Sequence, residues 1–238
     1  MTYTSASDYN SDPGLHKQRL SNLGTWIVKE DYVYDLLEGL GRDAKLLEIG
    51  CGNGRFLDNL KKRGFNNIWG ADLNNYLTNP EHAHIKVDLN TQKLPLAENE
   101  FDAVLAFQTI EHLENYFLIA QEARRVLKPN GLFIFSVPNQ FNIFYRIKFA
   151  LTGEVSGWDE KNNHLLFLTR SVFKKTYLRD FELEDVYFRK GLIPMYGRLT
   201  NILNKIPGVD ISHKLRILPR REIFADDVCY VLRKNNGK

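Results

Sequence analysis

The most constraining feature of this sequence is an apolar run that leads directly into a glycine-rich loop. Residues 46–54 read LLEIGCGNG, with three glycines in the last five positions. The next segment, Arg55–Arg63, has helical spacing and stops at Gly64. Glycine lets the backbone turn tightly and approach a ligand without an interfering Cβ, and the start of a helix attracts polar or anionic groups. This strand, loop and helix predict a cofactor-binding turn in an α/β protein.

Apolar runs and helical segments alternate along much of the chain. Strands are expected at 45–49, 67–73, 84–89, 101–107, 132–137, 182–188 and 228–233, and helices at 15–40, 55–63, 113–127, 141–151 and 169–178. The sequence Pro129-Asn130-Gly131 is expected to stop the helix that precedes it. Strands that are apolar on both faces and separated by helices are typical of a parallel sheet covered on both sides.

Composition indicates one globular domain. The 238 residues are 43% hydrophobic and 26% charged, which suits a chain with a sizeable buried core. Because no linker rich in Pro or Gly divides the chain, we expect a mobile lead-in at 1–14 and a single domain at 15–238. Within that domain we expect a helical cap at 15–40 and cap insertions at 140–168 and 189–226.

The cellular compartment is predicted from what the sequence lacks. Two cysteines are too few for a disulfide framework, and no apolar run approaches the 18 residues that a membrane span needs. The first residues show neither the basic region nor the apolar region of a secretory signal. We therefore expect a cytoplasmic protein.

The residues around the glycine-rich loop discriminate between cofactor classes. A dinucleotide fingerprint needs Gly or Ala where this chain has Arg55, which disfavours NAD, and no Lys-Ser/Thr pair follows the glycines, which excludes a P-loop. S-adenosylmethionine remains, and acids at three predicted strand ends suit it. Glu48 would face its ammonium group, Asp72 its ribose hydroxyls and Asp88 its adenine amino group.

Five motifs in order carry a resemblance to a known family. They read LLEIGCGNG (46–54), GADLN (70–74), KVDLN (86–90), LPLAENEFDAVLAFQTIEHLEN (94–115) and RVLKPNGLFIFSVPN (125–139). Together they resemble the class I S-adenosylmethionine-dependent methyltransferases. The resemblance implies a Rossmann-like sheet of seven mostly parallel strands with helices on both faces and an antiparallel last strand. A capping insertion between the last two strands would be added to that fold here.

The resemblance also implies a set of cofactor contacts. We expect S-adenosylmethionine, and its product S-adenosylhomocysteine, to contact Glu48, Gly50, Cys51, Gly52, Asn53, Asp72, Leu73, Asp88, Leu89 and Gln108. Leu89 would lie beside the adenine and Gln108 beside the methionyl part. Cys51 is interpreted as a small packing residue rather than a reactive thiol.

Candidate catalytic residues follow the fourth predicted strand. Methyl transfer needs a nucleophile held about 3–3.5 Å from the methyl carbon and, for a hydroxyl acceptor, a base. His112 is the candidate base, and Glu111 and His164 are the other candidate acid, base or ligand groups. The alternative is that Glu111 and His112 form a helix start, with His112 packed on the cofactor.

A metal-assisted variant is a second possibility. Small-RNA ribose 2′-O-methyltransferases and ubiquinone-pathway O-methyltransferases resemble this stretch and carry a metal-binding Glu-x-x-Glu-His pattern. The RNA enzymes also carry a second histidine before a Phe-x-x-Thr-Arg-like segment. Here Gln108 replaces the first acid of the pattern, while His164 precedes a segment of that kind. Loss of one charged ligand weakens a site for a hard divalent cation, so a metal is not favoured and no metal ligand is assigned.

The acceptor is predicted only by class. The Asp/Asn-Pro-Pro-aromatic motif of amino-group nucleic-acid methyltransferases is absent after the fourth strand, which favours oxygen of a small-molecule, saccharide or lipid-linked acceptor. A net charge of +3 does not favour nucleic acid. Residues 189–221 carry eight basic side chains against one acid, so they could contact a membrane surface or could simply be solvated. A non-catalytic S-adenosylmethionine-binding partner subunit remains the rival interpretation, and the oligomeric state is left open.

Overall fold

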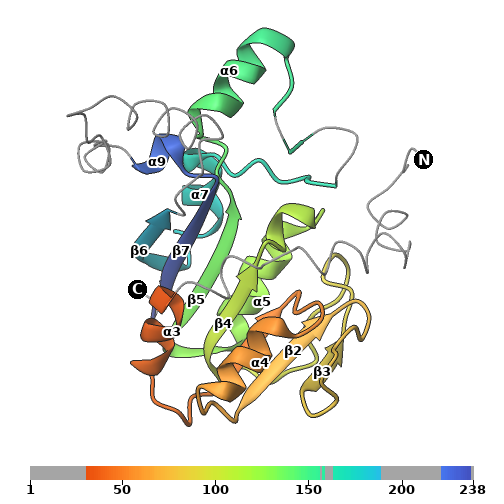
Figure 1. The fold of residues 1–238 in the computed structure, drawn as a ribbon. Helices are drawn as coiled ribbons and strands as arrows, with labels where there is room; N and C mark the ends of the chain where they lie inside the picture. Colours follow the sequence, from red (N-terminus) through yellow and green to blue (C-terminus); the bar gives the residue numbers. More distant parts are fainter. Residues whose placement is uncertain (1–30, 156, 159–162, 189–220, 237–238) are drawn as a thin grey trace, which may run out of the picture.

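Seven strands form one sheet in the computed structural model, which describes residues 31–155, 157–158, 163–188 and 221–236 (Figure 1). The strand order is β3-β2-β1-β4-β5-β7-β6. The strands are β1 (Leu46–Ile49), β2 (Ile68–Asp72), β3 (Ala83–Lys86), β4 (Phe101–Phe107), β5 (Leu127–Pro138), β6 (Phe181–Phe188) and β7 (Asp227–Lys234).

Strand pairing confirms the predicted fold class. β1 pairs in parallel with β2 and β4, and the β2–β3 and β4–β5 pairs are also parallel. Strand β7 runs antiparallel to both of its neighbours, β5 and β6. The chain therefore has a Rossmann-like sheet whose last strand is reversed.

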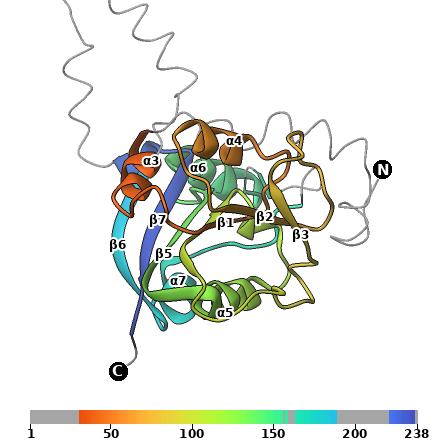
Figure 2. The same ribbon diagram turned by 90° about the horizontal axis from the view of Figure 1, so that it is seen from below.

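Helices cover both faces of the sheet. They are α3 (Asp31–Glu38), α4 (Arg55–Lys62), the 3₁₀ helix η2 (Ile110–His112), α5 (Tyr116–Val126), α6 (Ile143–Thr152), α7 (Arg170–Thr176) and α9 (Arg221–Phe224). Figure 2 shows α3 and α4 on one side of the sheet and α5 and α7 on the other. Each pair of helices buries its apolar face in a separate core, one built around Tyr34 and Leu57 and the other around Ala123 and Tyr177. None of the described helices is long and apolar enough to cross a membrane.

Among the described residues, three element boundaries differ from the sequence prediction by three residues or more, and the others by at most two. Strand β5 begins at Leu127, because Leu127 pairs with Phe101, so the predicted stop at Pro129-Asn130-Gly131 lies inside the strand. Helix α5 begins at Tyr116 rather than at 113, because the Asn115 side chain accepts a hydrogen bond from the Leu118 N–H and caps it there. Strand β3 ends at Lys86, so Asp88 and Leu89 follow the strand.

Several predicted segments lie outside the described residues. They are the lead-in at 1–14, the part of the helical cap before Asp31, and most of the insertion at 189–226. Helix α6 lies in the other cap insertion, 140–168, and none of the helix residues is buried.

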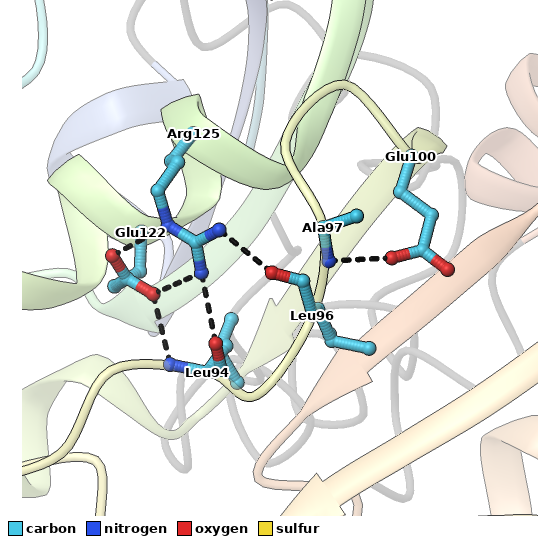
Figure 3. A network of polar contacts seen from close by, with 6 residues as sticks. All are labelled: Leu94, Leu96, Ala97, Glu100, Glu122 and Arg125. Atoms are coloured by element: carbon cyan, nitrogen blue, oxygen red, sulfur yellow. Dashed lines mark hydrogen bonds and ion pairs between the residues drawn. The ribbon is translucent and has the colours of Figure 1, made fainter.

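A buried ion pair fixes the loop between β3 and β4 against α5. Figure 3 shows Glu122 accepting hydrogen bonds from Arg125 and from the Leu94 N–H, while Arg125 also donates to the carbonyls of Leu94 and Leu96. Burial by itself would raise the pKa of Glu122, but the hydrogen bonds from Arg125 and Leu94 outweigh it and leave the pKa below its usual value. The network holds the loop that leads into β4.

Candidate active site

The glycine-rich loop joins β1 to α4 and packs closely against the segment that follows β4. Gly50 has φ +70°, and a Cβ built on it would lie 2.3 Å from Thr109 Oγ1. A side chain at this position is therefore excluded by space as well as by backbone conformation. Gly54, at φ +80°, is the residue from which α4 begins. The loop brings the carboxyl end of β1 against that of β4.

Cys51 and Asn53 complete the loop. Cys51 is buried, and a Cβ on Gly70 would lie 2.6 Å from its sulfur. Burial, with smaller contributions from the charges of Glu48 and Asp72, raises the pKa of the Cys51 thiol, which supports a packing role. The Asn53 carbonyl accepts hydrogen bonds from the N–H and hydroxyl of Thr78.

Asp72 ends β2 and is hydrogen-bonded to the glycine-rich loop. Its carboxylate accepts from the Gly52 N–H at 2.9 Å and from the Leu73 N–H at 2.7 Å. The two backbone donors orient the carboxylate at the carboxyl edge of the sheet, where open α/β sheets bind ligands. The structure thus brings together the predicted ribose-binding residue and the loop, and Leu73 lies half-buried beside them.

Glu48 lies inside β1 and is almost completely buried, with 5% of its surface exposed. Its Oε2 has no hydrogen-bond partner among the described residues. Burial, and next the charge of Asp72, raise the pKa of Glu48 well above its usual value. A buried carboxyl group with an unused acceptor suits a ligand that brings a cationic donor.

Asp88 is engaged within its own turn. Its Oδ1 accepts from the Asn90 N–H at 3.0 Å and its Oδ2 from the Thr91 hydroxyl at 2.9 Å. Leu89 is buried next to it. The predicted contact of Asp88 with an adenine amino group would have to share an oxygen with these bonds.

Gln108 follows β4 in a left-handed backbone conformation, with φ +50°. Non-glycine residues rarely adopt this region, and such strain is found most often at functional sites. Neighbouring β5 holds the conformation, because the Gln108 N–H donates to the Ser136 carbonyl at 3.1 Å and its side-chain amide lies 3.3 Å from Ser136 Oγ. This backbone conformation turns the chain from the end of β4 into η2.

Glu111, His112 and His164 form one cluster beyond this edge. One ligand atom from each lies within 4.8 Å of the others, and the two imidazole centroids are 4.8 Å apart. Backbone contacts bring the segments together, because the Leu165 N–H donates to the Glu111 carbonyl at 2.6 Å. His112 Nδ1 lies 3.4 Å from the Asn163 carbonyl oxygen. The three predicted candidate catalytic residues are therefore neighbours.

The Glu111 carboxyl group is the most deeply buried member, with 1% of its surface exposed. Neither of its oxygens has a hydrogen-bond partner among the described residues. Burial, reinforced by the charge of Asp227, raises the pKa of Glu111 well above its usual value. The group is stable either as a neutral acid or beside a cation.

Sequence reasoning missed three residues that support the site. Ser136 and Thr109 hold Gln108 and the glycine-rich loop, and Trp158 packs edge-on against His164 with centroids 5.2 Å apart. Ser136 carried a usable signal, since it is the one hydroxyl in the apolar run LFIFSV. Trp158 lies in a loop without a periodic pattern, so nothing local indicated its role.

The fold is that of a Rossmann-like protein, and its candidate cofactor site lies at the carboxyl ends of the parallel strands. The chain matches the family described as a methyltransferase domain over residues 27–186. It therefore belongs to that family, for which S-adenosylmethionine is the implied cofactor.

The individual relatives of this chain are distant in sequence. The chain is 28% identical over 160 residues to a ubiquinone biosynthesis O-methyltransferase of Rickettsia bellii, a match that covers 63% of this chain and 65% of the relative. It is 31% identical over 136 residues to a probable S-adenosylmethionine-dependent methyltransferase of Mycolicibacterium smegmatis, covering 54% of this chain and 49% of that protein. These matches thus leave a third or more of each relative uncovered.

A solved structure confirms the fold. The S-adenosylmethionine-dependent methyltransferase from Archaeoglobus fulgidus superposes with a TM-score of 0.64 at 17% identity, covering 94% of this chain and all of that one. At this identity the likeness concerns the fold.

Proposed function

We propose that this chain is an S-adenosylmethionine-dependent methyltransferase that methylates an oxygen of a small acceptor. The observation that carries the proposal is the placement of Glu111, His112 and His164 beside the edge that holds the glycine-rich loop and Asp72. The glycine-rich loop, Asp72 and His112 follow the adjacent strands β1, β2 and β4, so a methyl donor and an acceptor can meet between them.

The chain's own residues would bind the cofactor, orient the acceptor and remove the proton of its hydroxyl group. When bound, the cofactor would supply an electrophilic methyl group on its sulfonium and would leave as S-adenosylhomocysteine. Glu48 would pair with the ammonium group and Asp72 with the ribose hydroxyls. His112 would take the proton of the attacking hydroxyl, and His164 would orient the same group.

The surface beyond the site supports an apolar or lipid-linked acceptor. Six of the eight exposed large hydrophobic residues in the described part of the chain lie on α6 or shortly before α7: Phe144, Ile147, Phe149, Leu151, Leu165 and Phe167. Residues 165 and 166 make the backbone contacts to Glu111, so the exposed Leu165 adjoins the candidate catalytic cluster. The Rickettsia relative is named for ubiquinone biosynthesis, which is consistent with an acceptor of this class.

A cofactor titration and a transfer assay test the proposal. Calorimetry with S-adenosylhomocysteine should give saturable binding, with NADH as the negative control. Incubation with labelled S-adenosylmethionine and a fractionated cell extract should then label an acceptor that resists alkaline release of esters. Binding without any transfer would favour the non-catalytic partner subunit, and no binding by folded protein would remove the proposal.

The same cluster favours a second candidate, metal-assisted transfer. Glu111 offers two buried oxygens without hydrogen bonds among the described residues, and one ligand atom from each of His112 and His164 lies within 4.8 Å of a Glu111 oxygen, so the donor set fits one divalent cation. Glu111, His112 and His164 would hold the cation, which would polarise the acceptor oxygen. Equilibrium dialysis with Mg²⁺, Mn²⁺ and Zn²⁺, comparing the protein with Glu111→Gln, distinguishes the two candidates by metal bound per chain.

A further inference from the structure

An open cavity lies at the end of the sheet opposite the glycine-rich loop. Its volume is about 560 Å³, and it is lined by the carboxyl end of α5, the residues before β4 and β6, the start of β5 and the end of β7. The amino ends of the parallel strands meet there, whereas the candidate active site lies at their carboxyl ends. Figure 1 shows the carboxyl end of β7 far from α6. The cavity therefore has no part in the methyl-transfer site.

Basic side chains from three elements line this cavity: Arg124 of α5, Arg179 before β6 and Lys234 of β7. One carboxylate, Asp180, lies between the two arginines. Its Oδ2 is 2.8 Å from Arg179 Nη2, while its Oδ1 is 3.7 Å from Arg124 Nε. Asp180 thus hydrogen-bonds Arg179 and forms a longer ion pair with Arg124.

The remaining charges leave a positive excess. Arg125 also lines the cavity, but Glu122 and two backbone carbonyls satisfy it. Glu98 is the other acid in the lining, so the three cations Arg124, Arg179 and Lys234 face the two acids Glu98 and Asp180.

Two of the cations keep unused binding capacity. Arg124 Nε is buried and has no hydrogen-bond acceptor among the described residues. Lys234 Nζ donates to neutral oxygens, those of the Asn99 side chain and the Leu127 backbone. Burial lowers the pKa of Lys234, and the positive charge of Arg124 lowers it further. The Lys234 and Arg124 charges therefore repel each other within the cavity. An anion placed between them would relieve that repulsion and satisfy the buried donor.

We propose that this cavity binds a phosphate group between Arg124, Lys234 and Arg179. A guanidinium presents paired donors to a tetrahedral oxyanion, and the lysine adds a point charge. The cavity volume exceeds that of inorganic phosphate and falls in the range of small-molecule sites, so a phosphorylated metabolite also fits. The proposal is independent of the proposed methyl transfer.

Calorimetric titration in phosphate-free chloride buffer tests the site, with inorganic phosphate, a sugar phosphate and adenosine monophosphate as separate arms. Saturable binding at about 1 mM or tighter is expected for at least one of them. Tighter binding of a phosphomonoester than of inorganic phosphate would assign the site to a metabolite, and the reverse to free phosphate. Absence of saturation in all three arms up to about 20 mM would overturn the proposal.

Two variants locate the binding. Arg124→Gln and Arg179→Gln should each weaken it about tenfold or more, while Lys62→Met, which removes an exposed cation at the end of α4, should not. Because Lys234 also bonds the β5 backbone, the arginine variants test the site with less risk to folding. Retained S-adenosylhomocysteine binding and an unchanged thermal unfolding midpoint verify the fold. Equal weakening by Lys62→Met would show diffuse attraction only and would reject the site.

Discussion

The imidazole rings of His112 and His164 lie with centroids 4.8 Å apart, although one belongs to η2 and the other to the loop before α7. The Glu111 carbonyl accepts hydrogen bonds from Leu165 and Leu166 and so joins the two segments. Because these hydrogen bonds join backbone atoms, they hold the two segments together whichever side chains stand at 112 and 164. Either ring can therefore be replaced with limited risk to the local fold.

Replacing His112 with Ala should lower kcat about 10²-fold if His112 is the base, because one general base contributes about that factor. The affinity for S-adenosylhomocysteine should stay within about twofold, since the predicted cofactor contacts lie elsewhere. Steady-state transfer and calorimetry measure the two quantities. His84→Ala, in the edge strand β3, is the matched control and should keep the wild-type rate. A wild-type rate for His112→Ala would assign His112 to packing.

Asp72→Ala should weaken S-adenosylhomocysteine binding by about tenfold to a hundredfold. The variant removes the predicted acceptor of the ribose hydroxyls and also leaves the Gly52 N–H without its side-chain partner, losses of about 1–3 kcal/mol together. Calorimetric titration measures the change. Asp35→Ala, an exposed acid on α3, should bind like the wild type. Equal affinity of both variants would remove Asp72 from the cofactor site.

Gly50 and Gly41 provide a matched pair for testing the loop, because both have left-handed φ values, +70° and +88°. A Cβ on Gly50 would meet Thr109 at 2.3 Å, whereas nothing lies within 4 Å of a Cβ on Gly41. Gly41→Ala should cost about 1 kcal/mol of unfolding free energy from backbone strain alone. Gly50→Ala should cost more and should also impair cofactor binding. Urea unfolding and titration with S-adenosylhomocysteine measure both effects for the two variants. Equal losses of stability and of binding would mean that the contact with Thr109 is unimportant.

Much of the fold was predictable because the sheet is built from local patterns. The apolar run 101–107 matches β4 residue for residue, and the acid at the end of β2 lies where the sequence placed it. The start of β5 was not predictable, since Lys128, Pro129 and Asn130 have turn chemistry and only pairing with β4 makes the segment a strand. The contact of residues 165–166 with Glu111 is likewise long-range and has no local signal. The cluster's members could thus be named from sequence, but their proximity could not.

Stability should depend on pH through Glu122. The folded-state pKa of Glu122 lies below its unfolded value of about 4.3, so its stabilising contribution is complete at neutral pH. That contribution is lost as the pH falls through the folded-state pKa. Glu122→Gln should therefore lower the unfolding free energy at pH 7, and the difference should shrink as the pH falls below the unfolded value of about 4.3. Chemical denaturation at a series of pH values measures the difference, with exposed Glu81→Gln as control. A pH-independent difference would mean that the charge of Glu122 contributes nothing.

The exposed apolar surface of α6 should mediate contact with a lipid phase if the acceptor is lipid-linked. Ile147 and Leu151 are 50% and 80% exposed, and the helix carries Arg146 and Lys148 without any acid. Apolar side chains flanked by basic ones favour an anionic lipid surface. Sedimentation with phosphatidylglycerol vesicles should therefore retain the wild type, and Ile147→Glu should release it. Leu183→Glu removes a residue of similar exposure, 44%, from β6 and should leave binding intact. Equal release by both variants, or no binding of the wild type, would point to an acceptor that diffuses freely in water.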